Sequence, residues 1–430
     1  MNINSLIIGR NSEKFERINQ RKVFFESTFM QKVVEIIDDV RSYGDKALRE
    51  YIAEFDGYEL KGSLVFERQE LKAFYDSISK DLREALLKSK ENVEYFHRCQ
   101  LERSFFTEKD DFIVLGQKVT PLQRVGVYTP GGKASYPSSV IMNVVPAKVA
   151  GVNEINLCTP TTSGKINDAV MAAAYLSGVD RVFRVGGAQA IAAMAYGTES
   201  IPKVDKIVGP GNIFVALAKK MVFGLVDIDM IAGPSELVII ASEEANSSFV
   251  AADMLAQAEH DELAMVLVLT DSISLAKKIE NEVKRQLNVL PKKDIAEISL
   301  NDFGGIIVVN DLMEAFNIVN AIAPEHLELM IKNPDEYIPC IKNCGAIFVG
   351  ESSPTVVGDY IAGPNHTLPT AGSARFFSPL GVYDFIKRTS IIKYTRQALL
   401  KDGPYIIKLA ETEGLTGHAN SVYLRMNENI

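Results

Sequence analysis

Between residues 124 and 350 the chain repeats one pattern, and this pattern sets its fold class. Short apolar runs rich in β-branched residues are each followed by a turn of Gly, Ser or Pro and then by a helical stretch, as in RVGVYT, EINLCT, RVFRVG and KIVGP. The alternation restarts at ELVIIAS (236–242) and continues through AMVLVLT, GIIVVN and AIFVG. Alternating strands and helices form βαβ units with parallel strands. We therefore predict two α/β halves that meet near residues 228–236.

The flanking segments follow other patterns. Residues 26–98 are predicted to be helical, because Val33, Ile36, Ile37 and Val40 form an apolar stripe at a spacing of three to four. Beyond residue 350 the alternation ends, and a loop rich in Gly and Pro leads into a polar, mostly helical tail. A tail with so little apolar content is predicted to pack against something else, such as a second subunit.

Length and composition exclude several classes of protein. The chain has 430 residues, whereas one compact domain seldom exceeds about 250–300, so two to four units are expected. A net charge of −9 without a long Lys/Arg cluster argues against nucleic acid as a partner. No apolar run reaches the roughly 18–20 residues of a membrane helix, and the first residues lack a signal-peptide pattern. A cytoplasmic location without membrane contact is expected.

The cysteines do not form a recognisable site. Four scattered cysteines are too few for a disulfide framework. Cys340 and Cys344 are spaced closely enough for zinc, but no second pair of Cys or His lies nearby. We interpret both as buried free thiols.

Four glycine-containing turns stand where ligands bind in parallel α/β sheets, beyond the ends of strands. They lie in GVYTPGGKASYPSS, VGGAQA, VGPGN and AGPSE. Their glycines let backbone amides approach an anion such as a pyrophosphate. No G-x-G-x-x-G fingerprint is present, so tight turns without a ligand remain an equal alternative.

Histidine is scarce, so its placement is informative. His97 lies in a charged helical stretch, whereas the other four histidines stand beside acids, amides or glycines. These four are His260 in AEHDE, His326 in APEHLE, His366 in PNHTLPT and His418 in GLTGHAN. A single histidine in such a setting is more often structural, but four together favour a functional cluster.

Two of these motifs carry a definite chemistry. Gln257 and His260 are three residues apart on a predicted helix and project from one face. With Asp359, on a predicted loop, they offer the donors of a catalytic zinc site, although helix capping remains an alternative. Glu325 and His326 can divide acid and base work. Neighbours on a strand point to opposite faces, so a shared site requires an irregular backbone there.

Eight ordered segments between residues 125 and 422 resemble the histidinol dehydrogenase family. They are VGVYTPGGKASYPSSVIMNVVPAKVAGV, VGGAQAIAAMAYGT, VGPGNIFVALAK, DIDMIAGPSEL, QAEHD, APEHLE, GDYIAGPNHTLPTAGSAR and EGLTGHANSV. The resemblance implies oxidation of L-histidinol through bound L-histidinal to L-histidine, the last two steps of histidine biosynthesis, with two NAD⁺. It also implies one zinc ion per subunit and a homodimer whose active sites are shared.

The resemblance also implies a role for each matching residue. The implied metal ligands are Gln257, His260, Asp359 and, from the other subunit, His418, and all four also border the substrate. Glu325 and His326 match the acid–base pair, with His326 also touching the substrate. Ser235, His366 and Glu413 match contacts to histidinol. Tyr128, Gln189 and Asn212 match contacts to NAD.

Two positions depart from the family's pattern. Thr355 stands where the family commonly has Glu, four residues before Asp359, which puts the charge near the metal in doubt. Gly417 replaces the usual alanine before His418, a change that would loosen the tail.

We thus predict an α/β fold of two incomplete Rossmann-like parallel-sheet domains, with a helical N-terminal segment and a C-terminal dimer-swapped tail. Residues 1–25 would be an arm, and residues 26–123 with 237–380 the first α/β domain, which carries the metal and acid–base residues. Residues 124–236 would bind NAD, and residues 381–430 would reach the partner's site. From the residues alone, a metal-dependent hydrolase, a non-enzymatic metal-binding module and a dehydrogenase of aliphatic amino alcohols remain rival interpretations.

Overall fold

The computed structural model describes residues 5–19, 27–110, 112–131, 136–161 and 163–427. The chain divides into two compact units. The first unit comprises residues 1–100 and 122–385, and the second comprises residues 101–121 and 386–430. The first unit contains both predicted α/β halves, and the second contains most of the predicted tail.

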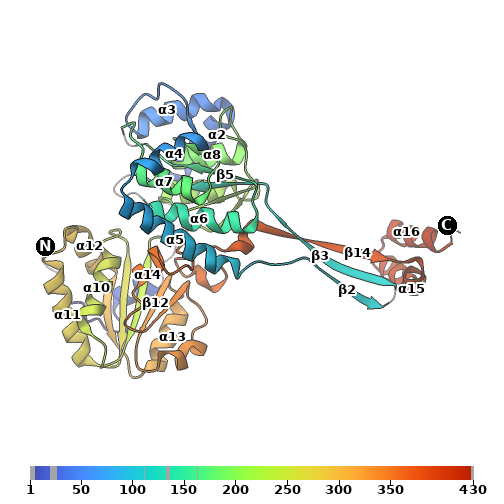
Figure 1. The fold of residues 1–430 in the computed structure, drawn as a ribbon. Helices are drawn as coiled ribbons and strands as arrows, with labels where there is room; N and C mark the ends of the chain where they lie inside the picture. Colours follow the sequence, from blue (N-terminus) through green and yellow to red (C-terminus); the bar gives the residue numbers. More distant parts are fainter. Residues whose placement is uncertain (1–4, 20–26, 111, 132–135, 162, 428–430) are drawn as a thin grey trace. The chain divides into compact units, whose positions relative to one another are not determined.

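The first unit holds two sheets built on the same plan (Figure 1). One sheet has the order β1-β6-β5-β4-β7-β8, in which only the edge strand β1 is antiparallel. Its strands are β1 (Val65–Glu67), β6 (Arg181–Phe183), β5 (Glu154–Cys158), β4 (Arg124–Tyr128), β7 (Lys206–Val208) and β8 (Asp227–Ile228). The other sheet is wholly parallel, in the order β11-β10-β9-β12-β13. Its strands are β11 (Gly304–Val308), β10 (Met265–Thr270), β9 (Glu236–Ala241), β12 (His326–Met330) and β13 (Ala346–Val349).

Counted along the chain, the five parallel strands of each sheet follow the Rossmann-like order 3-2-1-4-5. The order reverses between β4 and β7 in the first sheet and between β9 and β12 in the second, and such switch points are where open α/β sheets bind ligands. The prediction of two Rossmann-like parallel sheets is therefore confirmed.

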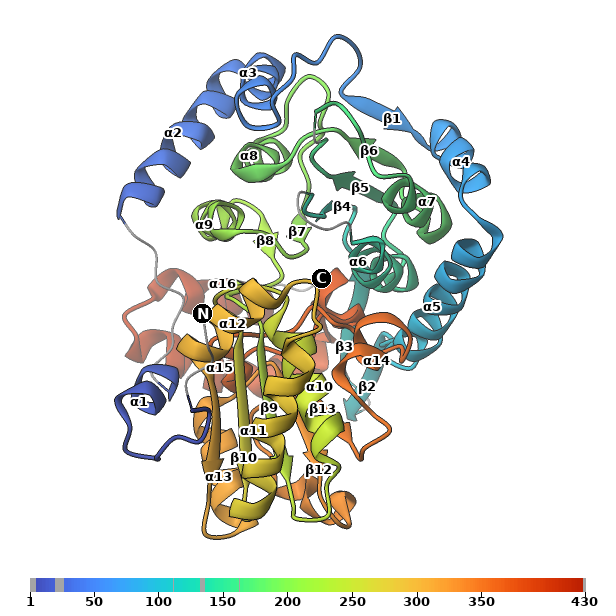
Figure 2. The ribbon, with the colours of Figure 1, turned by 90° about the vertical axis from the view of Figure 1, so that its left-hand side faces the viewer.

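Helices connect the strands and cover both sheets (Figure 2). The first sheet uses α6 (Pro137–Ala150), α7 (Asp168–Ser177), α8 (Gly187–Tyr196) and α9 (Ile213–Val222). The second uses α10 (Ser247–Ala258), α11 (Ile273–Leu287), α12 (Lys293–Phe303) and α13 (Leu312–Ile322), and α1 (Glu13–Asn19) and α14 (Thr355–Tyr360) belong to the same half. Every residue of β9 and β10 is buried, as expected for central strands covered on both faces.

The helical N-terminal segment contains α2 (Ser27–Tyr43), α3 (Asp45–Phe55), α4 (Arg68–Ser77) and α5 (Lys80–Arg98). The predicted apolar stripe on α2 is buried in one core with residues of α8 and α9. α4 packs on α7, α5 packs on α6, and β1 extends the edge of the first sheet.

The packing of this segment differs from the prediction that grouped residues 26–123 with residues 237–380. The physical reason is that the outer faces of α6–α9 are apolar, so these helices need a second layer. α5 does touch the other half, because the Asn92 side chain donates a hydrogen bond to the Ile361 carbonyl. The exact domain boundaries remain a prediction.

The second unit is an antiparallel sheet followed by two helices (Figure 1). The sheet has the order β14-β3-β2, from β14 (Ile386–Tyr394), β3 (Ile113–Pro121) and β2 (Phe105–Asp110). The helices are α15 (Arg396–Thr412) and α16 (Thr416–Asn427). The sequence analysis missed this sheet, because its central strand β3 pairs with a strand more than 260 positions away along the chain.

Two smaller expectations concern membranes and thiols. No helix of the described residues is long and apolar enough to cross a membrane. Cys340 and Cys344 are free and partly buried, and burial raises the pKa of the Cys344 thiol to about 11. Both cysteines are thus free thiols, as predicted, but they are only partly buried.

The packing of α2 yields a stability test. Ile36→Ala should lower the free energy of unfolding by about 2–4 kcal/mol, because it removes a side chain that is 3% exposed from the core shared with α8. Val34→Ala on the same helix, where the side chain is 46% exposed, should change it by less than about 0.5 kcal/mol. Urea denaturation followed by circular dichroism measures both. Equal effects of the two substitutions would contradict this packing.

Candidate functional site

Glu325 and His326 meet at the amino end of β12, beside the first residue of β9. The Nδ1–H of His326 donates a hydrogen bond to the Glu236 carbonyl at 3.0 Å. The backbone N–H of Glu236 donates to the Glu325 carboxylate at 2.9 Å. Because a carbonyl oxygen can only accept, the proton of neutral His326 lies on Nδ1, and Nε2 is the nitrogen that accepts a proton.

The backbone before β12 is irregular, as a shared site for adjacent residues requires. α13 ends at Ile322, and Ala323 adopts a left-handed conformation with φ of +55°. Pro324 follows, and regular pairing of β12 with β13 begins only at His326. The Glu325 carboxylate consequently lies 3.6 Å from His326 Nδ1 instead of on the opposite face of the sheet.

Both side chains of this pair are almost fully buried, at 7% and 6% exposure. Burial lowers the pKa of His326, and the negative charges of Asp359 and Glu236 only partly oppose this. A neutral imidazole at neutral pH can act as a general base.

Gln257 and His260 reach the same end of the second sheet. α10 begins after the carboxyl end of β9, so its last turn returns to the amino end, where Glu236 and His326 lie. The sequence analysis placed both residues on the helix, but α10 ends at Ala258. His260 stays on the same turn, since its N–H donates to the Gln257 carbonyl at 3.3 Å.

Asp359 and His366 complete the cluster. Asp359 lies on the short helix α14, not on a loop as predicted. The Nδ1–H of His366 donates to the Asp359 carbonyl at 3.0 Å, and its Nε2 lies 3.3 Å from Ser139 Oγ. Burial lowers the pKa of His366, Asp359 opposes this, and positive charge on His326 or His260 would lower the pKa further. These electrostatic interactions place the three histidines and Asp359 in one neighbourhood.

The donors of this cluster fit a divalent metal. The Gln257 side chain is 4% exposed, and its amide nitrogen has no hydrogen-bond partner among the described residues. The two ends of an amide are told apart only by their partners, so a cation at this position would be bound by the oxygen. Within the described ranges no three His, Cys, Asp or Glu side chains group closely enough to hold a metal alone. Gln257, His260 and Asp359 are three candidate donors, and a four-coordinate zinc leaves room for one further ligand.

The other two predicted residues of the active site belong to the second unit. His418 lies in the first turns of α16, and Glu413 follows the last residue of α15. Both side chains are exposed. Gly417, which departs from the family's pattern, lies in α16 with open space around it.

The three predicted NAD contacts stand at the carboxyl ends of the first sheet. Tyr128 ends β4, and its hydroxyl accepts a hydrogen bond from the Gly187 N–H at 3.1 Å. Gln189 lies two residues later, in the first turn of α8, with its side-chain oxygen buried and without a partner in the described chain. Asn212 precedes α9, and its side-chain oxygen accepts the N–H groups of Phe214 and Val215.

Sequence reasoning missed a buried carboxyl pair near the acid–base residues. Glu328 on β12 is hydrogen-bonded to Asp253 on α10, and burial raises the pKa of both groups. Glu328 also accepts the N–H of Thr355 at 2.8 Å. A carboxyl group thus lies at the start of α14 although residue 355 is not Glu. The signal was available, since Glu328 is the acid at a central position of a buried strand.

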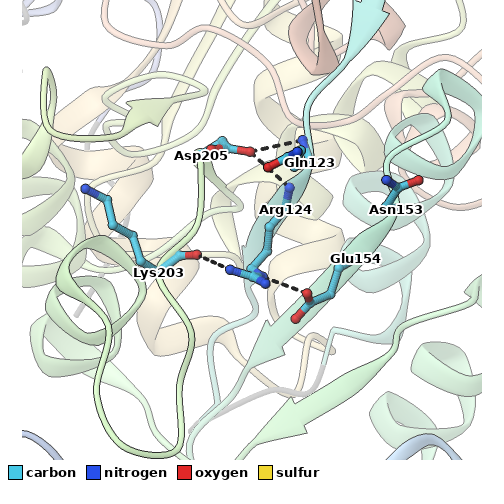
Figure 3. A pocket seen from close by; sticks show the side chains of 6 residues that line it. All are labelled: Gln123, Arg124, Asn153, Glu154, Lys203 and Asp205. Atoms are coloured by element: carbon cyan, nitrogen blue, oxygen red, sulfur yellow. Dashed lines mark hydrogen bonds and ion pairs between the residues drawn. The ribbon is translucent and has the colours of Figure 1, made fainter.

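One further pocket is lined by charged and amide residues, several of which are hydrogen-bonded to one another (Figure 3). It measures about 230 Å³ and lies at the amino ends of strands of the first sheet, lined by Gln123, Arg124, Asn153, Glu154, Lys203 and Asp205. Arg124 donates to the Glu154 carboxylate and to the Lys203 carbonyl, and Asp205 accepts the backbone N–H groups of Gln123 and Arg124. These contacts join neighbouring strands, so we assign the pocket a structural role.

Known proteins match this chain over almost its whole length. The family model described as histidinol dehydrogenase matches residues 19–426. The chain is 54% identical over 418 residues to the histidinol dehydrogenase of Aquifex aeolicus, covering 97% of both chains. It is 51% identical to that of Clostridium acetobutylicum, covering 96% of this chain and 95% of the relative.

A solved structure agrees with these matches. The crystal structure of histidinol dehydrogenase from Elizabethkingia anophelis superimposes with a TM-score of 0.93 at 36% identity, covering 99% of both chains. Family, sequence and fold thus agree. The chain belongs to the histidinol dehydrogenase family, whose members are NAD-dependent, zinc-binding oxidoreductases that convert L-histidinol through L-histidinal to L-histidine at the end of histidine biosynthesis.

Proposed function

We propose that His326 is the general base of both oxidations and that Glu325 activates water between them. The observation that supports this most directly is the hydrogen bond from His326 Nδ1 to the Glu236 carbonyl, which leaves Nε2 as the basic nitrogen. Family membership sets aside the rival hydrolase and the non-enzymatic module. The catalytic role of each residue is assigned below.

In the first oxidation, His326 Nε2 accepts the hydroxyl proton of histidinol while the carbinol carbon gives up hydride to the first NAD⁺. Glu325 then accepts a proton from the water that adds to the aldehyde, while protonated His326 returns its proton to the aldehyde oxygen and becomes a base again. In the second oxidation, His326 accepts a proton from the resulting hydrate as hydride passes to the second NAD⁺. The product is a carboxylate, and each oxidation yields one NADH.

Gln257, His260 and Asp359 with His418 of the partner subunit would hold the family's zinc, a Lewis acid for the amino and imidazole nitrogens of the substrate. Ser235, His366 and Glu413 would contact histidinol directly, in addition to the metal ligands and His326. Ser235 is fixed at the start of β9, because its carbonyl accepts the Met265 N–H at 2.9 Å. Tyr128, Gln189 and Asn212 would contact NAD.

The protein would act as a homodimer in which the tail completes the partner's active site. Two observations support this arrangement. The second unit leaves large apolar side chains in solvent, including Tyr405 at 73% and Leu409 at 66% exposure. The first unit supplies three of the four proposed zinc ligands, Gln257, His260 and Asp359. We propose a cytoplasmic location, with no nucleic acid or membrane as a partner.

The division of work between the two residues can be tested directly. His326→Gln should slow the oxidation of both histidinol and histidinal by about 10²–10⁴-fold, because both steps lose their base. Glu325→Gln should chiefly slow the oxidation of supplied histidinal. Single-turnover formation of NADH measures both steps. Zinc content and NAD affinity should stay unchanged in both variants, and equally small effects on the two steps would refute this assignment.

The proposed metal ligands predict a reversible loss of activity. Chelation should abolish NAD⁺ reduction, and added zinc should restore it with two NADH formed per histidinol. NAD affinity, measured by fluorescence, should survive chelation because its proposed contacts lie on the first sheet.

Matched variants test the ligands themselves. Gln257→Ala and Asp359→Asn should lower the zinc content of the purified protein. Cys344→Ser should retain full zinc, because that thiol lies outside the proposed ligand set. Full zinc in both ligand variants would show that the metal is bound elsewhere.

Mixing two inactive variants tests the shared site. His326→Gln and His418→Ala subunits should each be inactive alone. Unfolded and refolded together, they should recover about a quarter of wild-type activity, since half of the dimers are mixed and carry one intact site. If the tail served its own subunit, every site in the mixture would be damaged. No recovery in a mixture that forms dimers would therefore contradict the exchange of tails.

A further inference from the structure

The turn VGPGN after β7 is held by a buried ion pair that the proposed chemistry does not use. Lys219 on α9 is ion-paired with Asp229, which directly follows β8. The two residues are only 3% and 7% exposed. Burying both charges removes their hydration, so such a pair adds little net stability. The position of the pair beside the VGPGN turn indicates a role other than stability.

The ion pair is hydrogen-bonded to both the N–H and the carbonyl group of Gly209. Lys219 Nζ donates to the Gly209 carbonyl at 3.0 Å, and the Gly209 N–H donates to Asp229 Oδ2 at 2.8 Å. The other carboxylate oxygen, Oδ1, accepts the Met230 N–H at 2.6 Å. The ion pair therefore fixes the peptide groups on either side of Gly209.

The position of Gly209 requires this support. Its φ of +114° is a conformation that residues with a side chain rarely adopt, and a Cβ there would lie 2.0 Å from the Tyr128 carbonyl oxygen. Three residues later, the Asn212 side chain starts α9 by capping two backbone N–H groups. The turn thus brings together the end of β4 and the start of α9, where Tyr128 and Asn212 stand.

We propose that Lys219 and Asp229 are positioning residues for NAD: their ion pair holds the Gly209 turn in the shape that presents Tyr128 and Asn212 to the dinucleotide. The inference rests on the proposed function, which assigns Tyr128 and Asn212 to NAD. Neither charged group takes part in proton or hydride transfer. The loss of the pair should therefore weaken cofactor binding and leave the chemical steps intact.

The test uses Lys219→Met and Asp229→Asn in the full-length enzyme. Each should raise the KM for NAD⁺ and the Kd for NADH by about tenfold or more, the loss expected for a hydrogen bond to a charged group. The kcat at saturating NAD⁺ and the KM for histidinol should stay within about twofold of wild type, which is the signature of lost uniform binding. Steady-state kinetics and fluorescence titration with NADH measure these quantities.

Lys206→Met is the matched control for the loss of a buried lysine. Lys206 lies on β7 of the same sheet, with its side chain 4% exposed, and is paired with Asp227 at 2.9 Å and Asp384 at 3.5 Å. Its ammonium group holds these two carboxylates, not the Gly209 peptide. NAD affinity should be unchanged in this variant, and an equal loss there would overturn the proposal.

Asn212→Ala separates this inference from the proposed function. Unchanged NAD affinity in Asn212→Ala would refute the proposed cofactor contact itself. Weaker affinity in Asn212→Ala but not in folded Lys219→Met or Asp229→Asn would refute the role of the ion pair alone. If Lys219→Met does not fold, Asp229→Asn decides, because it keeps an oxygen for the Gly209 N–H while removing the charge. Wild-type NAD affinity in that variant would then refute the role of the pair.

Discussion

The candidate active site depends on two backbone hydrogen bonds of one residue, Glu236. Its N–H holds the Glu325 carboxylate, and its carbonyl fixes the proton of His326 on Nδ1. The Glu236 side chain adds a third link, because its carboxylate accepts the Ala371 N–H in the segment that follows His366. Both contacts are made by the backbone at the start of β9, so they do not depend on the conformation of the Glu236 side chain. Because the tautomer of His326 is already set, the imidazole need not reorganise when the proton is transferred.

The position of this pair departs from the usual rule for parallel sheets. Ligands normally bind at the carboxyl ends of the strands, near the switch point. The proposed NAD contacts obey that rule on the first sheet, but Glu325 and His326 lie at the amino ends of the second. The segment between Asp229 and Glu236 links the two places, since it leaves β8 of the first sheet and enters β9 of the second. Six residues, 230–235, thus lie between Asp229, which holds the turn, and Glu236, which holds His326.

Much of this arrangement was predictable from sequence. The alternation of strands and helices predicted both sheets, and the stripe on residues 33–40 predicted the buried face of α2. Other features were not, because they depend on residues far apart in the chain. β3 pairs with β14, and Asp359 lies on α14, whose first residue Thr355 donates its N–H to Glu328. His97 lies in a charged helical stretch of the sequence, yet its side chain is buried beside Asn365.

The four polar histidines show where sequence stops and tertiary structure takes over. Local patterns and the family's motifs were enough to name the reaction, the cofactors and the residue types of the site. The reason is that each motif places its reactive residues within a short stretch of sequence. Only the folded first unit shows that His260, His326 and His366 share one neighbourhood with Asp359, since they come from different loops and strands of the second sheet. Only it shows which nitrogen of His326 is basic, because that depends on a hydrogen bond to a residue 90 positions earlier. The spacing of residues along the chain does not reveal hydrogen bonds between residues so far apart.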